Sequence, residues 1–459
     1  MDASRTPQLE AFLRQGGTHT SADIRRAIGG SQPTVSRALA ALGDRIVRVG
    51  RGRAIRYGLA RDIARAGHRW PLYRIDAEGR AAHLGDLGAL QGQGFYFASP
   101  RSLPAFAHAE FVSGLFPGLP WFLDDQRPQG FLGRAFARRI AAEIGAPAQL
   151  HRWQADDVLL GMLLHGHDLV GDLVLGESAL QRALQRVISP HGMLSLAERQ
   201  DRYPEKANAA LAGENVGSSA AGEQPKFLAM LRGDEGVREV IVKFSEGGDS
   251  PAGQRWRDLL HCEGIAANVL PAHGQPSART EVLEADGRVF LESTRFDRTP
   301  KGGRSGFVSL AALDSAFHGH GRIDWWRYAT QLQRENWIDA DSARRLRVLG
   351  WFGDLIGNSD MHLGNAGLEL ADNRPLALVP TYDMLPMMFR PASTGEVVER
   401  EFAITLPTPD KRGDWSTAAT AAMDFWQRVS ASGLVSATFK SIARKAGEKV
   451  SRALQQFGE

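Results

Sequence analysis

The sequence predicts an α+β protein: a small basic unit followed by a larger unit whose first part is mixed α/β and whose last part is mainly helical. Three observations predict this: a basic first segment, an apolar strand that carries a lysine, and a polar loop after an apolar helix. At 459 residues the chain is longer than the ~250 to 300 residues at which single cores stop growing. We place the basic unit at residues 1–65, the mixed α/β part at 66–295 and the mainly helical part at 296–459.

The composition is that of an ordinary globular protein, with 43% hydrophobic and 23% charged residues. No apolar run approaches the ~20 residues that a membrane-spanning helix needs, so no membrane partner is expected. The first residues, MDASRTPQLEAFLRQ, lack the apolar core of a secretory signal, and the single cysteine, Cys262, cannot form an internal disulfide. These features favour a cytoplasmic location.

The basic character belongs to the first segment. Residues 1–61 contain eleven arginines and four acidic residues, a local net charge of +7, whereas the rest of the chain is slightly acidic. Residues 9–15 and 21–28 are typical of short helices, the second capped by Ser21. In SQPTVSRALAALG, Ser31 can cap a third helix, with a proline in its first turn and a glycine at its end.

This third helix and the residues after it indicate a DNA-binding unit. Helical spacing puts the apolar residues on one face and leaves Gln32, Thr34, Ser36 and Arg37 on the outer face, where a recognition helix contacts bases. Residues 45–59 follow as two short β-type runs around an RGR tip. Their arginines, available to phosphates, are Arg48, Arg51, Arg53 and Arg56. Three helices followed by an arginine-tipped hairpin predict a winged helix-turn-helix that binds duplex DNA through residues 1–61. Such domains often form homodimers. The alternative is a small helical cap with a solvated basic face.

A strand with an inward-facing lysine lies in the middle of the chain. Small residues in GSSAAGEQPKFLAML would let backbone N–H groups approach an anion, to which Lys226 adds charge. In VREVIVKFSE, alternation puts Ile241 and Lys243 on one side and Val240, Val242 and Phe244 on the other. A lysine buried in this way needs an anion, and the helix over 255–270 offers Glu263. An edge lysine that reaches water beside a solvated glutamate is the alternative.

The polar loop GNSDMHLGN follows an apolar helix. Asp360 and Asn365 have the D-x-x-x-x-N spacing of a phosphoryl-transfer loop, in which the carboxylate is the base and the amide oxygen binds Mg²⁺. A probable hairpin then returns to TYDML, where Asp383 can supply a second metal ligand. His362 could complete a transition-metal triad with the two aspartates, but one histidine among oxygen ligands suits Mg²⁺ better. We expect His362 to orient the loop.

Five short motifs together carry a family resemblance: SSAAGEQPK, VIVKF, STRFDR at 293–298, GNSDMHLGN and PTYDM. Over residues 70 to 440 the chain resembles the HipA family of bacterial serine/threonine kinases, the toxins of toxin-antitoxin modules. The resemblance implies a bilobal protein-kinase-like fold, ATP and Mg²⁺ as cofactors, and growth arrest leading to persistence. Implied partners are a protein substrate, such as an aminoacyl-tRNA synthetase or another translation factor, and an antitoxin.

The resemblance also implies roles for individual residues. Lys243 would bind the ATP phosphates, Thr294 to Phe296 would form the adenine hinge, Asp360 would be the catalytic base, and Asn365 and Asp383 would hold Mg²⁺. The remaining implied ATP-site residues are Ser219, Ala221, Gly222, Glu223, Gln224, Lys226 and Glu263. Ser219, or the adjacent Ser218, matches the serine whose autophosphorylation would expel the loop and silence the kinase.

The sequence departs from the family pattern in three places. Gly364 replaces the usual lysine before the loop asparagine, Pro225 replaces a glutamate, and the basic unit at the front is an addition. Two other functions therefore remain open. One is a DNA-binding transcription regulator with an inactive kinase fold, and the other is a small-molecule phosphotransferase.

Overall fold

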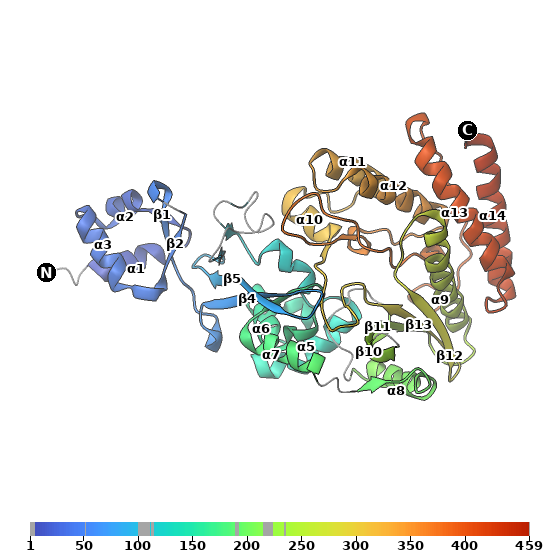
Figure 1. Ribbon diagram of the computed structural model, residues 1–459, viewed down its shortest axis with the longest axis horizontal. Helices are drawn as coiled ribbons and strands as arrows, with labels where there is room; N and C mark the ends of the chain where they lie inside the picture. Colours follow the sequence, from blue (N-terminus) through green and yellow to red (C-terminus); the bar gives the residue numbers. More distant parts are fainter. Residues whose placement is uncertain are drawn as a thin grey trace.

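The structure, a computed structural model, describes residues 5–50, 52–99, 111, 114–188, 192–213, 224–233 and 236–458. The chain is arranged along one long axis (Figure 1). The small N-terminal unit lies at one end, two regions that each contain a β-sheet lie in the middle, and a group of helices lies at the other end. The predicted α+β class, with a mixed first lobe and a mainly helical second lobe, is confirmed.

The N-terminal unit has three helices and a three-stranded sheet in the order β1-β3-β2. Its elements are α1 (Arg5–Leu13), β1 (His19–Thr20), α2 (Ser21–Ile28), α3 (Gln32–Ala41), β2 (Ile46–Val49) and β3 (Arg56–Leu59). The apolar faces of the helices meet in one small core around Leu9, Ile24 and Leu39. Three helices followed by a hairpin is the element order of a winged helix-turn-helix.

Two details of this unit differ from the prediction. The N-cap of α2 is Thr20, not Ser21, because the Thr20 hydroxyl accepts from the Asp23 N–H at 3.1 Å while the Asp23 carboxylate accepts from the Thr20 N–H at 3.0 Å. Helix α1 occupies residues 5–13 rather than 9–15. Ser31 is the N-cap residue of α3, as expected, although its side chain makes no capping bond.

Backbone contacts fix this unit on the next domain. Ala60 and Leu90 form an isolated β-bridge, and the Arg61 N–H donates to the Ala89 carbonyl at 3.0 Å. The Arg61 guanidinium also donates to both carboxylate oxygens of Asp156, at 2.5 and 3.0 Å. The two parts therefore touch through main chain as well as side chains.

Among the described residues, the middle of the chain contains an antiparallel five-stranded sheet and three helices. The strands are β4 (Arg69–Ile75), β5 (Ala81–Ala89), β6 (Phe95–Ala98), β7 (Leu115–Phe116) and β8 (Leu173–Leu175), in the order β7-β6-β5-β4-β8. The helices are α5 (Gly130–Ile144), α6 (Ala155–His165) and α7 (Glu177–Ile188).

A second five-stranded sheet positions the predicted lysine. Its order is β12-β13-β11-β10-β9. Its strands are β9 (Met193–Leu194), β10 (Lys226–Gly233), β11 (Gly236–Phe244), β12 (Thr280–Ala285) and β13 (Arg288–Thr294), with helices α8 (Arg199–Leu211) and α9 (Pro251–Val269). Val240, Val242 and Phe244 share a buried cluster with Tyr203 of α8, so the predicted alternation along β11 is confirmed. Lys243 is consequently directed to the opposite face.

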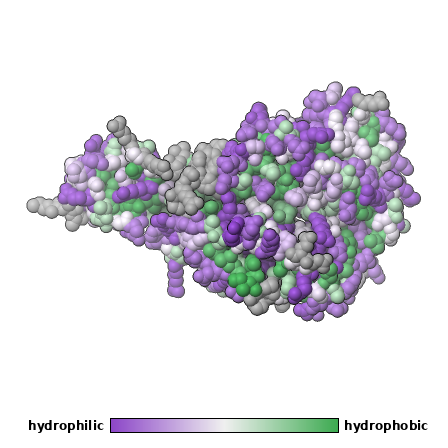
Figure 2. Space-filling view, in the orientation of Figure 1, coloured by the Kyte–Doolittle hydropathy of each residue, from purple (hydrophilic) through white to green (hydrophobic). Residues whose placement is uncertain are grey.

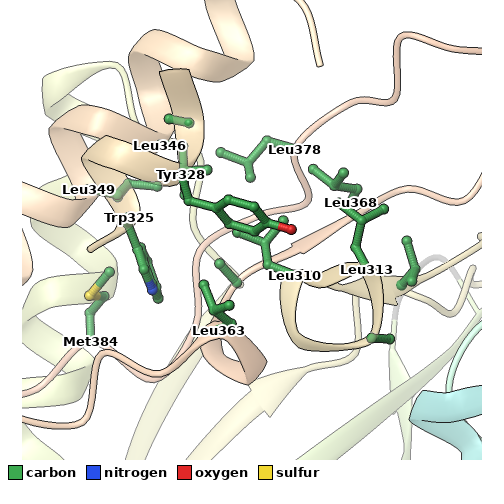
Figure 3. Close-up of a cluster of buried hydrophobic side chains, with 14 of the residues drawn as sticks. Leu310, Leu313, Trp325, Tyr328, Leu346, Leu349, Leu363, Leu368, Leu378 and Met384 are labelled. Atoms are coloured by element: carbon green, nitrogen blue, oxygen red, sulfur yellow. The ribbon is translucent and has the colours of Figure 1, made fainter. Parts of the chain in front are cut away.

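The last part of the chain is mainly helical. It contains α10 (Leu310–Phe317), α11 (Trp325–Arg334), α12 (Ala340–Leu355), α13 (Arg412–Ala431) and α14 (Ala437–Phe457), with the short pair β14 (Val308–Ser309) and β15 (Gly367–Leu368). Figure 3 shows Leu310 of α10 and Leu363 of the polar loop in one hydrophobic cluster with side chains of α11 and α12. This packing fixes the polar loop relative to the helices.

Hydrophilic residues cover most of the face seen in Figure 2. Among the described residues, no helix is both long enough and apolar enough to cross a membrane.

Candidate active site

A cavity of about 370 Å³ lies where the second sheet meets the helical part. Its lining includes the following predicted site residues: Lys226, Lys243, Glu263, Thr294, Phe296, His362, Asn365 and Asp383. A second cavity of about 430 Å³, lined by residues of α7, α8 and β10, contains none of the predicted site residues.

Lys243 binds two carboxylates in this cavity. Its Nζ donates to Glu263 Oε1 at 2.6 Å and also contacts Asp383 Oδ1. The Lys243 and Glu263 side chains are only 8% and 6% exposed. The predicted pairing with Glu263 is therefore present, which excludes the alternative of an edge lysine beside a solvated glutamate.

Lys226 lies directly opposite Lys243 on the neighbouring strand. The two residues are register partners in the β10–β11 ladder, and Lys226 is 2% exposed. Like charges at opposed positions of a sheet repel each other. Both lysines line the cavity, and Lys243 reaches it together with its carboxylate partners Glu263 and Asp383.

Hydrogen bonds hold the polar loop against Asp383. The Asp360 N–H donates to Asn358 Oδ1 at 3.0 Å, and Asn358 Nδ2 donates to the Asp383 carbonyl at 3.2 Å. Asn365 Nδ2 donates to the Asp360 carbonyl at 2.9 Å. Because the Asn365 nitrogen is used in this way, its amide oxygen is the atom that can bind a cation.

His362 caps the turn that follows it. Its Nδ1 accepts from the Gly364 N–H at 3.0 Å, the kind of orienting hydrogen bond expected for it. A Cβ on Gly364 would lie 2.9 Å from two atoms of the His362 ring. A side chain at 364 would thus require the ring to move, which gives a physical reason for the glycine at this position.

The oxygen atoms of Asp383 and Asn365 fit Mg²⁺. This ion is usually held by one or two carboxylates together with substrate phosphates and water, rather than by a complete protein cage. In the described part of the chain, no three His, Cys, Asp or Glu side chains form a group that could hold a metal. The triad of Asp360, His362 and Asp383, the alternative to Mg²⁺, is therefore not assembled.

Aromatic rings and a buried ionic network shape the predicted hinge. The Phe296 ring stacks on Tyr382 at a centroid distance of 5.6 Å, and the Tyr382 hydroxyl donates to the Gly364 carbonyl at 3.0 Å. The Arg295 guanidinium donates to Asp168 of the middle domain at 2.8 Å and to Asp297. Burial alone would raise the pKa of Asp297, but the neighbouring guanidiniums outweigh it and hold that pKa below its usual range.

Comparison with known proteins gives the family. Residues 66–184 match the family described as YjjJ-like toxin, middle domain, and residues 218–454 match the HipA-like C-terminal domain. Toxin YjjJ of Escherichia coli strain K12 is 36% identical over 445 residues, which cover 96% of this chain and 97% of that protein. The chain belongs to the family of HipA-like, YjjJ-like toxins. Every predicted site residue from Ser218 to Asp383 lies within the HipA-like match.

Two solved structures resemble this HipA-like chain more distantly. One is HipA in the Shewanella oneidensis MR-1 complex of HipA, HipB and operator DNA, with 13% identity, a TM-score of 0.49, and coverage of 83% of this chain and 97% of that one. The other is the Helicobacter pylori proinflammatory kinase CtkA, with 12% identity, a TM-score of 0.34, and coverage of 52% and 93%.

The described residues include only part of the predicted phosphate loop of this HipA-like chain. Ser218, Ser219, Ala221, Gly222 and Glu223 lie outside the described residues. Gln224 is described, and its Nε2 is buried without a hydrogen-bond partner among the described atoms.

The sequence analysis missed several residues at the site. Asn358 connects Asp360 to Asp383, and Tyr382 connects the hinge to the loop; both stand beside predicted residues, so proximity in the motifs was the available clue. Asp124, Asp125 and Gln129 of the YjjJ-like middle domain also line the cavity. Nothing in their local sequence pointed to a site whose predicted residues lie between positions 226 and 383 of the chain.

Proposed function

We propose that the chain is an ATP-dependent serine/threonine protein kinase that acts as a growth-arrest toxin and carries its own DNA-binding unit. One observation supports the kinase proposal above all: a buried lysine and its two carboxylate partners line one cavity together with Asn365, which holds the Asp360 backbone by a hydrogen bond. Membership of the YjjJ-like toxin family supports the proposed role as a toxin. The proposed protein target is an aminoacyl-tRNA synthetase or another translation factor, and the proposed regulator is an antitoxin.

Each residue has a defined task under this proposal. Lys243 and Lys226 bind phosphate oxygens, while Asn365 and Asp383 supply oxygen ligands for Mg²⁺, which would neutralise charge on the phosphates. Asp360 accepts the proton of the acceptor hydroxyl as the hydroxyl oxygen attacks the γ-phosphorus and ADP departs. His362 and Asn358 keep the loop in place by hydrogen bonds.

Intact mass spectrometry of the full chain after incubation with Mg·ATP tests the proposal. We expect the wild type to gain the mass of one phosphate by autophosphorylation, and Ser219→Ala to lose this gain while the matched variant Ser218→Ala keeps it. A gain in Ser219→Ala and none in Ser218→Ala would move the modified site to Ser218. If the wild type gains no phosphate and also transfers none to a protein acceptor, the kinase proposal fails. A DNA-binding regulator with an inactive kinase fold would then be the better interpretation, in line with the unusual Gly364 and Pro225.

The surface of the N-terminal unit supports the proposed DNA binding. Gln32, Ser36 and Arg37 are exposed on the outer face of α3, and Thr34 is half-buried there. Arg48 on β2 and Arg56 on β3 are also exposed, with the Arg56 guanidinium donating to the Thr18 hydroxyl at 3.0 Å. Arg51 and the side chain of Arg53 lie outside what the structure describes.

Deletion of residues 1–61 should abolish duplex binding that weakens steeply with salt. The reason is counterion release, in which each phosphate contact contributes about −0.9 to the slope of log affinity against log salt. The double variant Arg48→Ala, Arg56→Ala should make that slope shallower by about two, whereas Arg444→Ala on the exposed face of α14 should not change it. Fluorescence anisotropy across a salt series measures both quantities. Equal binding by the truncated protein would refute the assignment.

A further inference from the structure

The middle domain supplies part of the cavity wall. Asp124 and Asp125 belong to the 3₁₀ turn Trp121–Gln126, and Gln129 directly precedes α5. Trp121, Phe122 and Leu123 of the same turn are buried in the main hydrophobic cluster. The carboxylates of this turn are therefore held on a rigid support.

Asp125 is tied to the part of the fold that carries the polar loop. Its Oδ2 accepts from the Ser309 N–H at 2.6 Å. Ser309 precedes α10, and its strand β14 pairs with β15, two residues after Asn365. Leu310 and Leu363 pack in the cluster of Figure 3, so the position of Asp125 is fixed relative to the loop.

Asp125 has no cationic partner among the described residues, whereas the neighbouring Asp124 pairs with Arg127 at 2.5 Å. Burial raises the pKa of Asp125 to about 6. Its hydrogen-bond partner among the described residues is Ser309, which leaves further acceptor positions on this carboxylate, and the carboxylate lines a cavity. Such a group suits a ligand that donates hydrogen bonds.

The aromatic residues show which part of the cavity Asp125 faces. Tyr382 stacks on Phe296 of the hinge on one side and is followed in the chain by Asp383, the partner of Lys243. Asp125 and Ser309, which donates to it, line the same cavity as Phe296, Tyr382 and Asp383. Asp125 therefore shares the cavity with the segment that connects the hinge to the phosphate-binding lysine.

We propose that Asp125 accepts hydrogen bonds from the ribose hydroxyls of the bound nucleotide and makes the site selective for ribonucleoside over deoxyribonucleoside triphosphates. This proposal rests on the proposed function, because it assumes a base at Phe296 and phosphates at Lys243. A sugar would then lie between them, beside Asp125. Hydrogen bonds from a hydroxyl to a carboxylate are short and stronger than those between neutral groups.

Calorimetric titration of the full chain with Mg·ATP, Mg·2′-deoxy-ATP and Mg·3′-deoxy-ATP tests this. We expect wild type to bind at least one deoxy analogue about tenfold more weakly than ATP, the effect of losing one hydrogen bond to a charged group. Asp125→Ala should bind ATP about tenfold more weakly and should show no further loss with that analogue. Asp125→Asn can still accept from the Ser309 N–H, so it serves as the variant that preserves the fold, and we expect it to discriminate less than wild type.

The outcomes separate this inference from the kinase proposal. Failure of the wild type to bind any of the three nucleotides would overturn both. Binding of ATP and both deoxy analogues with equal affinity by the wild type would overturn the ribose assignment and leave the kinase proposal intact. The ribose assignment would also fall, on its own, if both Asp125 variants keep the discrimination of wild type, for instance because the carboxylate instead binds a basic residue of the protein acceptor.

Discussion

Replacing Asp360 by asparagine is expected to lower the rate of phosphate transfer by roughly 10²- to 10⁴-fold, the usual contribution of a positioned general base. Asparagine has nearly the same shape, and the backbone N–H and carbonyl of residue 360 can still bond to Asn358 and Asn365. The loop should therefore keep its conformation and lose only the group that accepts the proton. Affinity for Mg·ATP should change little.

Single-turnover assays with labelled ATP, together with calorimetric nucleotide titration, measure the two effects separately. Asp341→Asn is a matched control, because Asp341 is an exposed aspartate in the first turn of α12, the helix that leads to the loop. Its activity should equal that of the wild type. Undiminished transfer by Asp360→Asn would show that another group takes the proton and would overturn the assignment of the base.

The Lys243→Met variant is expected to lose both activity and stability. Methionine fills similar space but leaves the buried carboxylate of Glu263 and the partly exposed carboxylate of Asp383 without their shared cation. Breaking a buried ion pair by removing one partner costs about 3 to 5 kcal/mol, so the free energy of unfolding should fall by about 3 kcal/mol. Loss of the phosphate contact should reduce phosphate transfer by roughly 10²-fold or more.

Chemical denaturation at neutral pH and the same single-turnover assay measure these effects. Lys445→Met on the exposed face of α14 is the matched control and should leave both quantities unchanged. A stable Lys243→Met protein with wild-type turnover would mean that the lysine neither neutralises the carboxylates nor binds phosphate. A stable but inactive protein would separate the two roles and retain only the phosphate contact.

Local sequence patterns were sufficient to predict the strand that carries Lys243 and the three helices and hairpin of the N-terminal unit, but not its first strand, β1. Both depend on regularities that repeat every two or every 3.6 residues, and the buried face of β11 followed the first of these. Boundaries were less well predicted. The cap of α2 moved by one residue, because Thr20 and Asp23 satisfy each other's N–H groups and Ser21 already lies inside the helix.

The sequence by itself determined the chemistry available to this protein: a lysine on a buried strand, a loop with Asp360 and Asn365, and an aspartate downstream at 383. Only the tertiary structure decided that Lys243, Asn365 and Asp383 share one cavity, that Asn358 and Tyr382 connect its parts, and that Asp125 of the middle domain joins them. The physical reason is the distance along the chain over which each kind of interaction acts. Propensities and caps act over a few residues, whereas the convergence of segments hundreds of residues apart is set by the packing of the hydrophobic cores that carry them.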